Sequence, residues 1–319
     1  MKYKMPAEWE KHEATWLAWP HNISHWPGNF GPIPAVFAKI AVTLSEGENV
    51  YICVKDQEME DSARAEIEKL IKTEKAASPL KIKFFHIPTD ASWSRDHGPI
   101  FVRDENGKLI ITDWIFNSWG GKYEPWDQDD LVPQKISKIF NIPYLEPGIV
   151  LEGGSIEVNG KGVLLTTRQC LLNKNRNPHL SHAQIEKYLG DYLGADKILW
   201  LEEGIVGDDT DGHIDDIARF VDEQTIVTVV EDKKNDENYE ILQKNLRDLK
   251  EMRDVDGQPF KIVELPMPDP VIYEDQRLPA SYANFYIGNS LVIVPTFRCS
   301  KDEVVLETLR ALFPGRKVV

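Results

Sequence analysis

Four times in this sequence, two apolar runs flank a short polar stretch, and the repeats begin roughly sixty residues apart. In two of them the polar stretch holds an Asn-Gly pair, Asn106-Gly107 and Asn159-Gly160. Such a pair between alternating apolar residues is the strongest short-range signal for a β-hairpin, because both turn positions need a positive φ. The sequence therefore predicts four hairpins, at residues 100–112, 156–167, 217–230 and 285–296.

An amphipathic helix is predicted after each hairpin, since apolar residues recur there at helical spacing. The second helix opens with Ser181 and Gln184, and the fourth with Ser300 and Glu303, in the spacing of a capping box. The four helices are expected at residues 131–140, 181–193, 237–253 and 300–313.

A unit of strands plus one helix cannot bury its apolar face alone, so repeated units of this kind stack against one another. Residues 49–54 and 62–73 supply a strand and a helix ahead of the first hairpin, which makes five units. We expect an α/β fold, a closed pseudo-fivefold α/β propeller, in a single domain over residues 1–319. The alternative is an open mixed sheet with helices on its faces.

The charge balance argues against two classes of partner. The 319 residues include 52 acidic and 37 basic side chains, a formal net charge of −15. Such a chain repels nucleic-acid phosphates and anionic membrane surfaces, and it favours encounter with cations. We predict neither a signal peptide nor a membrane span, because the first residues lack an apolar core and no run approaches about 18 apolar residues. Three cysteines without CxxC spacing fit a reducing, cytoplasmic location.

The segment GDDTDGHIDD, residues 207–216, carries the strongest chemical signal. His213 and Asp215 are two residues apart and would share one face of an extended strand. Histidine titrates near neutral pH, and a neighbouring carboxylate can orient it and stabilise its charged form. The alternative is a satisfied histidine in a surface turn with solvated aspartates. A calcium loop is excluded because Gly212 stands where an EF-hand needs a ligand.

Two further segments place acidic groups beside turns. In WSRDHGP, Asp96 lies near a Gly-Pro turn and could present its carboxylate to a planar cation; the alternative is a structural pair with Arg95. In LEGGS, Glu152 precedes a Gly pair, and an ordinary turn at the start of a strand is the alternative. Trp93 and Trp119 lie in or near these segments and are candidate pocket walls, since indole rings hold guanidinium groups by cation–π contact.

Together these groups predict a compact, delocalised cation as the substrate. Carboxylates would pair with its N–H groups while a nucleophile attacks its central carbon, and a thiolate suits that attack at neutral pH. Of the three cysteines, Cys299 is the best placed, because it directly precedes a predicted helix N-terminus. Cys53 falls in an apolar strand, where it would be buried and inert, and Cys170 closes a strand.

Seven motifs together resemble the agmatine deiminase family, also called bacterial-type peptidyl-arginine deiminases. They are MPAEWEKHEATWLAWPHN, WSRDHGPIFV, FNSWGGKY, LEGGSIEVNG, CLLNKNRNP, GDDTDGHIDDIARF and SYANFYI. The resemblance implies the five-bladed propeller (pentein) fold of the guanidino-group-modifying superfamily, with no metal or organic cofactor. It also implies hydrolysis of agmatine to N-carbamoylputrescine and ammonia through a covalent cysteine-thiouronium adduct, with peptidyl arginine as the alternative substrate.

The same resemblance assigns roles to residues of this chain. Asp96 and Asp215 would grip the guanidinium, and His213 would act as acid and then as base. Glu152 would support His213 or a substrate nitrogen. The further pocket residues implied are Trp119, Asp209 and Asn284.

Two features depart from the family pattern. Asp90-Ala91 stands where the family often has Asn-Asp, so one substrate-side carboxylate is expected to be displaced or missing. The family's nucleophilic cysteine lies in a Gly-rich segment ending in His-Cys, and no residue here matches it. The last residues, GRKVV up to Val319, resemble the strand just upstream of that segment. We therefore expect a chain that lacks its C-terminal segment and binds cations without turning them over.

Two other functions are compatible with parts of the pattern. Asp211, His213 and Asp215 fit the Asp-x-His-x-Asp ligand spacing of a manganese ureohydrolase, although no suitably placed Asp-x-Asp cluster accompanies them. A non-catalytic relative that binds agmatine or a polyamine is the second alternative, because the cysteine is missing. In each case the expected partner is a small cationic guanidino compound or polyamine. A homodimer is compatible with the fold.

Overall fold

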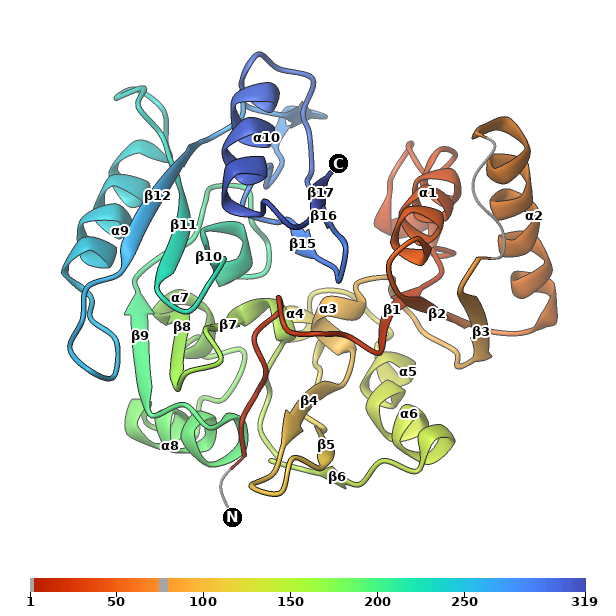
Figure 1. The fold of residues 1–319 in the computed structure, drawn as a ribbon, viewed down its shortest axis with the longest axis horizontal. Helices are drawn as coiled ribbons and strands as arrows, with labels where there is room; N and C mark the ends of the chain where they lie inside the picture. Colours follow the sequence, from red (N-terminus) through yellow and green to blue (C-terminus); the bar gives the residue numbers. More distant parts are fainter. Residues whose placement is uncertain (1–2, 75–79) are drawn as a thin grey trace.

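The computed structural model describes residues 3–74 and 80–319, whose strands form five three-stranded sheets and one two-stranded hairpin. The sheets follow one another in chain order around a common centre, with the longer helices on the outside (Figure 1). The first sheet consists of β1 (Ala14–Ala18), β2 (Asn49–Val54) and β3 (Ile82–His86), and the second of β4 (Ile100–Arg103), β5 (Leu109–Thr112) and β6 (Tyr144–Leu145). The third consists of β7 (Ile156–Val158), β8 (Val163–Thr167) and β9 (Lys197–Leu201), and the fourth of β10 (Ala218–Phe220), β11 (Thr225–Val230) and β12 (Lys261–Pro266). The fifth consists of β15 (Tyr286–Ile287), β16 (Leu291–Ile293) and β17 (Lys317–Val318), and the separate hairpin of β13 (Ile272–Tyr273) and β14 (Gln276–Arg277).

Four of the sheets share one plan. Their first two strands are antiparallel, and their third strand pairs in parallel with the second. The four predicted hairpins are thereby confirmed, and the third strands β6, β9 and β12 are additions to the prediction. A helix joins the second strand to the third in each case, close to its predicted range: α6 (Val132–Phe140), α8 (His182–Leu193), α9 (Tyr239–Glu251) and α10 (Lys301–Leu312).

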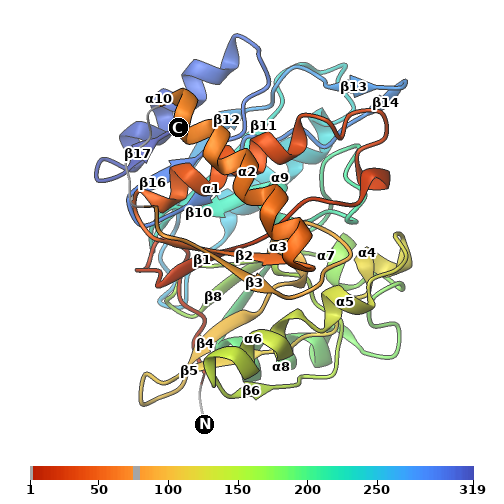
Figure 2. The same cartoon turned by 90° about the vertical axis from the view of Figure 1, so that its right-hand side faces the viewer.

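The first sheet is built differently, because β1, β2 and β3 are all parallel. Parallel neighbours need crossover connections. These are α1 (Ile33–Ser45) and α2 (Gln57–Glu74), which lie together on one side of the sheet (Figure 2). The strand predicted at residues 49–54 is confirmed as β2, and the helix predicted at residues 62–73 begins earlier, at Gln57.

The Asn-Gly turns differ in detail from the prediction. The positive φ belongs to the glycines, 78° at Gly107 and 65° at Gly160. The Asn159 side chain instead accepts the backbone N–H groups of Lys161 (2.8 Å) and Val163 (3.1 Å). A side-chain hydrogen bond therefore fixes this turn, and two consecutive left-handed residues are not needed.

One of the two predicted capping boxes is confirmed. Ser181 accepts the N–H of Gln184, whose side chain accepts the N–H of Ser181 in return. The prediction for α10 is wrong, because Ser300 has helical backbone angles (φ −62°, ψ −15°) and its side chain caps nothing. Asp302 in the first turn accepts the N–H of Phe297 instead.

Buried apolar side chains join neighbouring sheets to one another. Separate clusters connect the first sheet with the second, the second with the third, and the third with the fourth and fifth. A fourth cluster packs Leu291 of the fifth sheet against the first sheet and α1. Representative members of the four clusters are Cys53 with Ile111, Val102 with Leu164, Leu165 with Val292, and Ile52 with Leu291.

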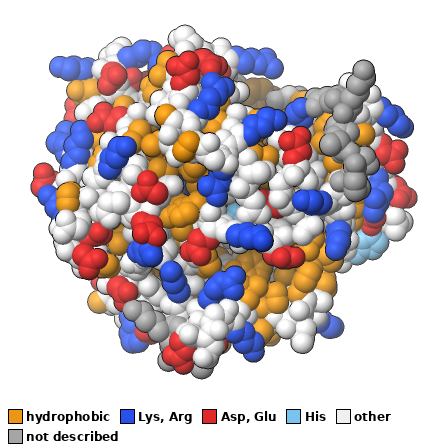
Figure 3. All heavy atoms as spheres, in the orientation of Figure 1, with side chains coloured by type: hydrophobic (Ala, Val, Ile, Leu, Met, Phe, Trp, Pro, Cys, Tyr) orange, Lys and Arg blue, Asp and Glu red, His pale blue; other side chains and the backbone are white. Residues whose placement is uncertain are grey.

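The surface is mixed in charge on the face seen in Figure 1. Acidic and basic side chains are interspersed over it (Figure 3). Among the described residues, no helix combines the length and the apolar character that crossing a bilayer requires.

Where the units meet, charged side chains connect them, and two of these, Glu157 and Arg219, are buried. The N-terminal segment passes through the centre of the molecule (Figure 1), and Glu8 there accepts hydrogen bonds from Arg95 (2.6 Å) and from the backbone of Ile287 (2.8 Å). Glu8 also lies 2.9 Å from Arg219 of β10, which donates to Glu157 of β7 (2.8 Å). We call Glu8, Arg95, Glu157 and Arg219 the central ion cluster. It connects the N-terminal segment to the second, third, fourth and fifth units.

Loss of the Glu8 charge should destabilise the fold. Burial alone would raise the pKa of Glu8, but Arg219 and Arg95 lower it to about 2. We expect Glu8→Gln to reduce the free energy of unfolding at pH 7 by about 3 kcal/mol in urea titrations, because the buried Arg219 and the partly exposed Arg95 each lose a carboxylate that faces them. The contribution of Glu8 is complete above its ordinary pKa of 4.5 and is lost as the pH falls toward about 2.

The difference between Glu8→Gln and the parent protein should therefore narrow between pH 5 and pH 3. The exposed turn residue Glu105 provides a control, and Glu105→Gln should change little. A difference that stays constant over this pH range would contradict the role of the Glu8 carboxylate.

Candidate active site

Three short helical turns bring the candidate residues together. They are α3 (Ser94–His97), η2 (Gly153–Ser155) and η3 (Ile214–Asp216), each directly before or at the start of a hairpin, and α3 and η3 both pack against η2. Because η3 is a 3-10 turn, the prediction that His213 and Asp215 share one face of an extended strand is wrong. The turn still directs both side chains toward Gly154 of η2.

The side chains of Asp96, His213 and Asp215 converge on Gly154. A β-carbon added at Gly154 would lie 2.5 Å from His213 Nδ1, 2.7 Å from Asp96 Oδ1 and 2.9 Å from Asp215 Oδ2. The backbone N–H of Gly154 donates to Asp96 Oδ1 (3.0 Å), and His213 Nδ1 lies 3.6 Å from the same oxygen. His213 is 2% and Asp215 7% exposed, which rules out the solvated surface turn.

The other acidic residues of GDDTDGHIDD hold the loop in place. Asp208 accepts the backbone N–H groups of Thr210 (2.7 Å), Gly212 (2.9 Å) and His213 (3.0 Å). Three such bonds fix the backbone directly before the imidazole. Asp208 is therefore a positioning residue that the sequence analysis did not single out.

Glu152 is completely buried and paired with a cation that the sequence analysis missed. Its Oε1 accepts a hydrogen bond from Arg176 Nε at 2.6 Å. Arg176 also donates to Asp211 (2.7 Å) and to the carbonyl of Thr210 (2.8 Å), so it connects Glu152 to the loop of His213. The motif CLLNKNRNP contains Arg176, and an arginine among turn-forming residues was the available signal.

Burial sets the charge state of the site. It lowers the pKa of His213 to about 3, with help from the nearby Arg176, so the imidazole is neutral at pH 7. Burial, Asp215 and Glu152 raise the pKa of Asp96 well above its ordinary value. Burial raises the pKa of Asp215 to about 6, although Arg95 and Arg219 partly oppose this. The site concentrates acidic groups whose ionisation a bound cation would favour.

Aromatic rings form one side of the site. The indole N–H of Trp119 donates to Asp96 Oδ2 (3.1 Å), and its ring meets Trp93 edge-to-face at 5.7 Å. Trp119 adopts a left-handed backbone (φ 54°), held by the Asn117 side chain, which accepts the N–H of Gly120. Trp93 is 38% exposed and stacks on Trp26 at 5.2 Å. Both indoles predicted as pocket walls therefore lie beside Asp96.

Two predicted pocket residues lie further out. Asp209 is exposed and accepts a hydrogen bond from the Tyr123 hydroxyl. Asn284 is exposed as well, and it donates to the buried Asp216 (3.0 Å), the neighbour of Asp215. The structure connects Asn284 to the site through Asp216, whereas Asp209 lies at the surface.

Asp90 and Ala91, which depart from the family pattern, hold a loop in place through hydrogen bonds. Asp90 accepts the N–H of Gln128 (2.8 Å), and the backbone N–H groups of Asp90 and Ala91 donate to Asp129. These bonds fix the loop that leads to Trp93. Arg95, which could have paired with Asp96, instead donates to Glu8.

Cys170 is placed differently from the prediction that it closes a strand. It follows the end of β8, in the helical turn α7 (Arg168–Leu171), and is buried near Glu152 and His213. Burial raises its thiol pKa well above 9. Cys53 is buried in β2, as predicted, and this burial raises its pKa to about 12. The Cys299 thiol contacts the Tyr282 hydroxyl (3.1 Å) and Asp302.

Known proteins are similar to this chain over nearly its whole length. The family profile described as Porphyromonas-type peptidyl-arginine deiminase matches residues 4–319. The agmatine deiminase of Pseudomonas aeruginosa is 38% identical over 340 residues, covering 99% of this chain and 89% of the relative.

Two solved structures are similar as well. The agmatine deiminase of Enterococcus faecalis superposes with a TM-score of 0.90 at 34% identity, covering 100% of this chain and 90% of the other. A cysteine-to-serine variant of the C. jejuni agmatine deiminase with substrate bound gives a TM-score of 0.88 at 36% identity, with 99% and 90% covered. This chain therefore belongs to the Porphyromonas-type peptidyl-arginine deiminase family.

Proposed function

We propose that this protein is an amidine hydrolase that converts agmatine to N-carbamoylputrescine and ammonia. The convergence of Asp96, His213 and Asp215 on Gly154 carries the proposal, because it sets two carboxylates and one imidazole around a single small space. Two carboxylates can pair with the N–H groups of one planar guanidinium. The names of the relatives support agmatine as the substrate.

Asp96 and Asp215 would grip the guanidinium in this site. Asp96 is held by hydrogen bonds from Gly154 and Trp119, so its carboxylate cannot turn away. A cation between the two carboxylates lowers the cost of ionising both in a buried site. Trp93 and Trp119 would cover the guanidinium plane or the alkyl chain.

His213 would carry protons between the reacting groups. As a neutral imidazole, it accepts the proton of the attacking thiol, whose sulfur then bonds to the guanidinium carbon. The protonated His213 returns a proton to the leaving nitrogen, the C–N bond breaks, and ammonia departs. His213 next takes a proton from water, the oxygen attacks the thiouronium carbon, the C–S bond breaks, and the sulfur regains its proton. Glu152 would orient His213.

We also propose that the attacking thiolate comes from a cysteine other than Cys53, Cys170 and Cys299. Cys53 and Cys170 are buried thiols with raised pKa values. Cys299 is engaged with Tyr282 and Asp302, and it belongs to a different segment from those that converge on Gly154. The carboxylates and His213 alone would then bind the cation without hydrolysing it.

We propose that the five sheets form a closed pseudo-fivefold propeller. The apolar clusters that join each sheet to the next support it, as does the packing of Leu291 from the fifth sheet against the first. A closed ring places the short turns α3, η2 and η3 at the inner ends of three successive units.

Parallel ammonia assays on the product of the complete gene test the proposed reaction. We expect ammonia and N-carbamoylputrescine from agmatine, with a kcat/KM at least about 100-fold above those for arginine and an arginyl peptide, because differential transition-state binding sets specificity.

Equal or faster release of ammonia from the peptide would favour a peptidyl-arginine deiminase. Binding without ammonia would favour a non-catalytic relative, and urea formation abolished by a chelator would favour a ureohydrolase. An intact mass above 36.5 kDa would support a cysteine beyond these residues.

Substitution of Gly154 tests the geometry. The added methyl group of Gly154→Ala would lie within 3 Å of Asp96, His213 and Asp215, so these side chains would have to move apart. We expect agmatine to bind at least about tenfold more weakly by calorimetry, a loss of about 1.4 kcal/mol or more. Gly31→Ala is the matched control, because its added methyl would meet no atom within 4 Å. Unchanged affinity in a folded Gly154→Ala protein would refute this location of the site.

Neutralising Asp215 should stabilise the free protein. Its folded-state pKa of about 6 exceeds the ordinary 3.8, so the native state binds more protons between these values and loses stability as the pH rises through them. We expect Asp215→Asn to raise the free energy of unfolding by about 1–3 kcal/mol at pH 8 and by little at pH 4. Urea titrations at both pH values measure this.

Asp236→Asn should change the free energy of unfolding in the opposite direction from Asp215→Asn. Burial raises the pKa of Asp236, but the hydrogen bond from Arg277 lowers it overall. This substitution should therefore destabilise the protein at pH 8. If Asp215→Asn destabilised the folded protein at pH 8 as well, the proposed cost of carboxylate crowding would be wrong.

A further inference from the structure

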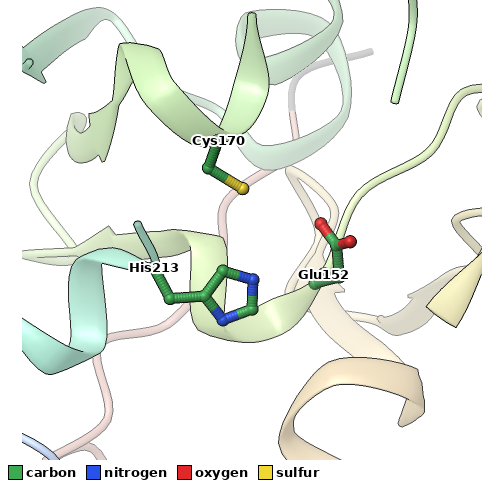
Figure 4. A group of neighbouring side chains, drawn as sticks. All are labelled: Glu152, Cys170 and His213. Carbon is green, nitrogen blue, oxygen red and sulfur yellow. The ribbon is translucent and has the colours of Figure 1, made fainter. Parts of the chain in front are cut away.

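Three side chains of metal-binding type lie together in the interior, and the proposed reaction uses only two of them. Each of Glu152, Cys170 and His213 offers one ligand atom, and these atoms all lie within 4.8 Å of one another (Figure 4). All three side chains are buried, at 0%, 0% and 2% exposure. They come from three separate segments, so the fold and not a local motif assembles them.

One polar atom of Glu152 and one of His213 have no hydrogen-bond partner among the described residues. They are Oε2 of Glu152 and Nε2 of His213, and both are shielded from solvent. Buried polar atoms in native proteins are nearly always paired, so two unpaired atoms that share one space suggest a missing ligand. Figure 4 shows a ring nitrogen of His213 turned toward the thiol and the carboxylate.

The other polar atom of each side chain faces a protein group. Glu152 Oε1 accepts from Arg176, and His213 Nδ1 lies 3.6 Å from Asp96 Oδ1. A carboxylate behind the far nitrogen of an imidazole is the arrangement that orients metal-bound histidines. Both Glu152 Oε2 and His213 Nε2 are thereby directed into the shared space.

The donor set has the chemistry and the charge for a borderline-soft dication. Sulfur, imidazole nitrogen and carboxylate oxygen are the ligands of Zn²⁺. A thiolate and a carboxylate balance two positive charges, and coordination removes the thiol proton, which is released to solvent. Arg176 contacts Glu152 at 2.6 Å and Asp211 at 2.7 Å, so Glu152 shares this cation with a second carboxylate.

We propose that Glu152, Cys170 and His213 form a binding site for Zn²⁺ or a similar thiophilic divalent cation. A closer approach of the three side chains would bring their atoms to coordination distance, with a water molecule as the fourth ligand. The metal occupies His213 Nε2 and therefore prevents proton transfer by this residue. That inhibitory consequence rests on the proposed function, whereas metal binding itself does not.

Titration of the chain with Co²⁺ tests the site without any activity assay. We expect one equivalent to produce a thiolate-to-cobalt charge-transfer band, developing slowly because the ligands are buried. Zn²⁺ should displace the cobalt and abolish the band, whereas Mg²⁺, which prefers oxygen ligands, should not. Cys170→Ala should lose the band and weaken Zn²⁺ binding by more than about tenfold, since even outer-shell changes cost 10–100-fold.

Cys53→Ala is the matched control, because it removes another buried thiol far from these ligands in sequence and should leave the band unchanged. X-ray absorption of the zinc-loaded parent protein should find one sulfur and one imidazole per metal, a result that does not depend on the folding of any variant. No band at excess Co²⁺, a band that persists in Cys170→Ala, or a coordination shell without sulfur would each overturn the proposal.

Discussion

The central ion cluster is the interaction on which the rest of the structure depends. Arg219 reaches Glu157 in one direction and Glu8 in the other, and Glu8 also binds Arg95 and the backbone of Ile287. The loss of one partner would leave a charge buried without compensation, which is far costlier than the net gain from the intact pairs. The cluster therefore acts less as a source of stability than as a constraint that admits one arrangement of the units.

Arg95, a member of the central ion cluster, also positions the backbone of the candidate site. A β-carbon at Gly153 would lie 2.0 Å from the carbonyl oxygen of Arg95, so the backbone of η2 can approach α3 only because glycine stands there. That approach puts Gly154 against Asp96, and Arg95 and Arg219 moderate the pKa of Asp215 from the other side. Acidic groups crowd the site while the cations that balance them point away, into the cluster. A guanidinium would complete a charge balance that the protein leaves open.

Local signals in the sequence predicted much of this molecule. Alternating apolar runs found the four hairpins, and helical spacing found the longer helices other than α1, because both signals depend on neighbouring residues. The structure brings Asp96, His213 and Asp215 together, although through a 3-10 turn and not a strand, and their roles in the reaction stay predictions. Short third strands such as β6 carry too few residues for a periodic pattern. The partners of Glu8, Glu152 and Arg219 lie in other units, so a single sequence gives no sign of these pairs.

The two ring nitrogens of His213 face different groups. Its Nδ1 faces Asp96, which would bind the substrate, while its Nε2 faces Glu152 and the thiol of Cys170. Burial keeps the ring neutral, and a neutral imidazole has one nitrogen that accepts a proton and one that donates. If the proton lies on Nδ1, toward Asp96, then Nε2 presents its lone pair to the interior. Proton transfer toward the substrate would use Nδ1 as the accepting nitrogen, which requires the proton of the neutral ring to lie on Nε2. A cation that coordinates Nε2 would hold that proton on Nδ1, so metal binding and proton transfer require opposite tautomers of the same ring.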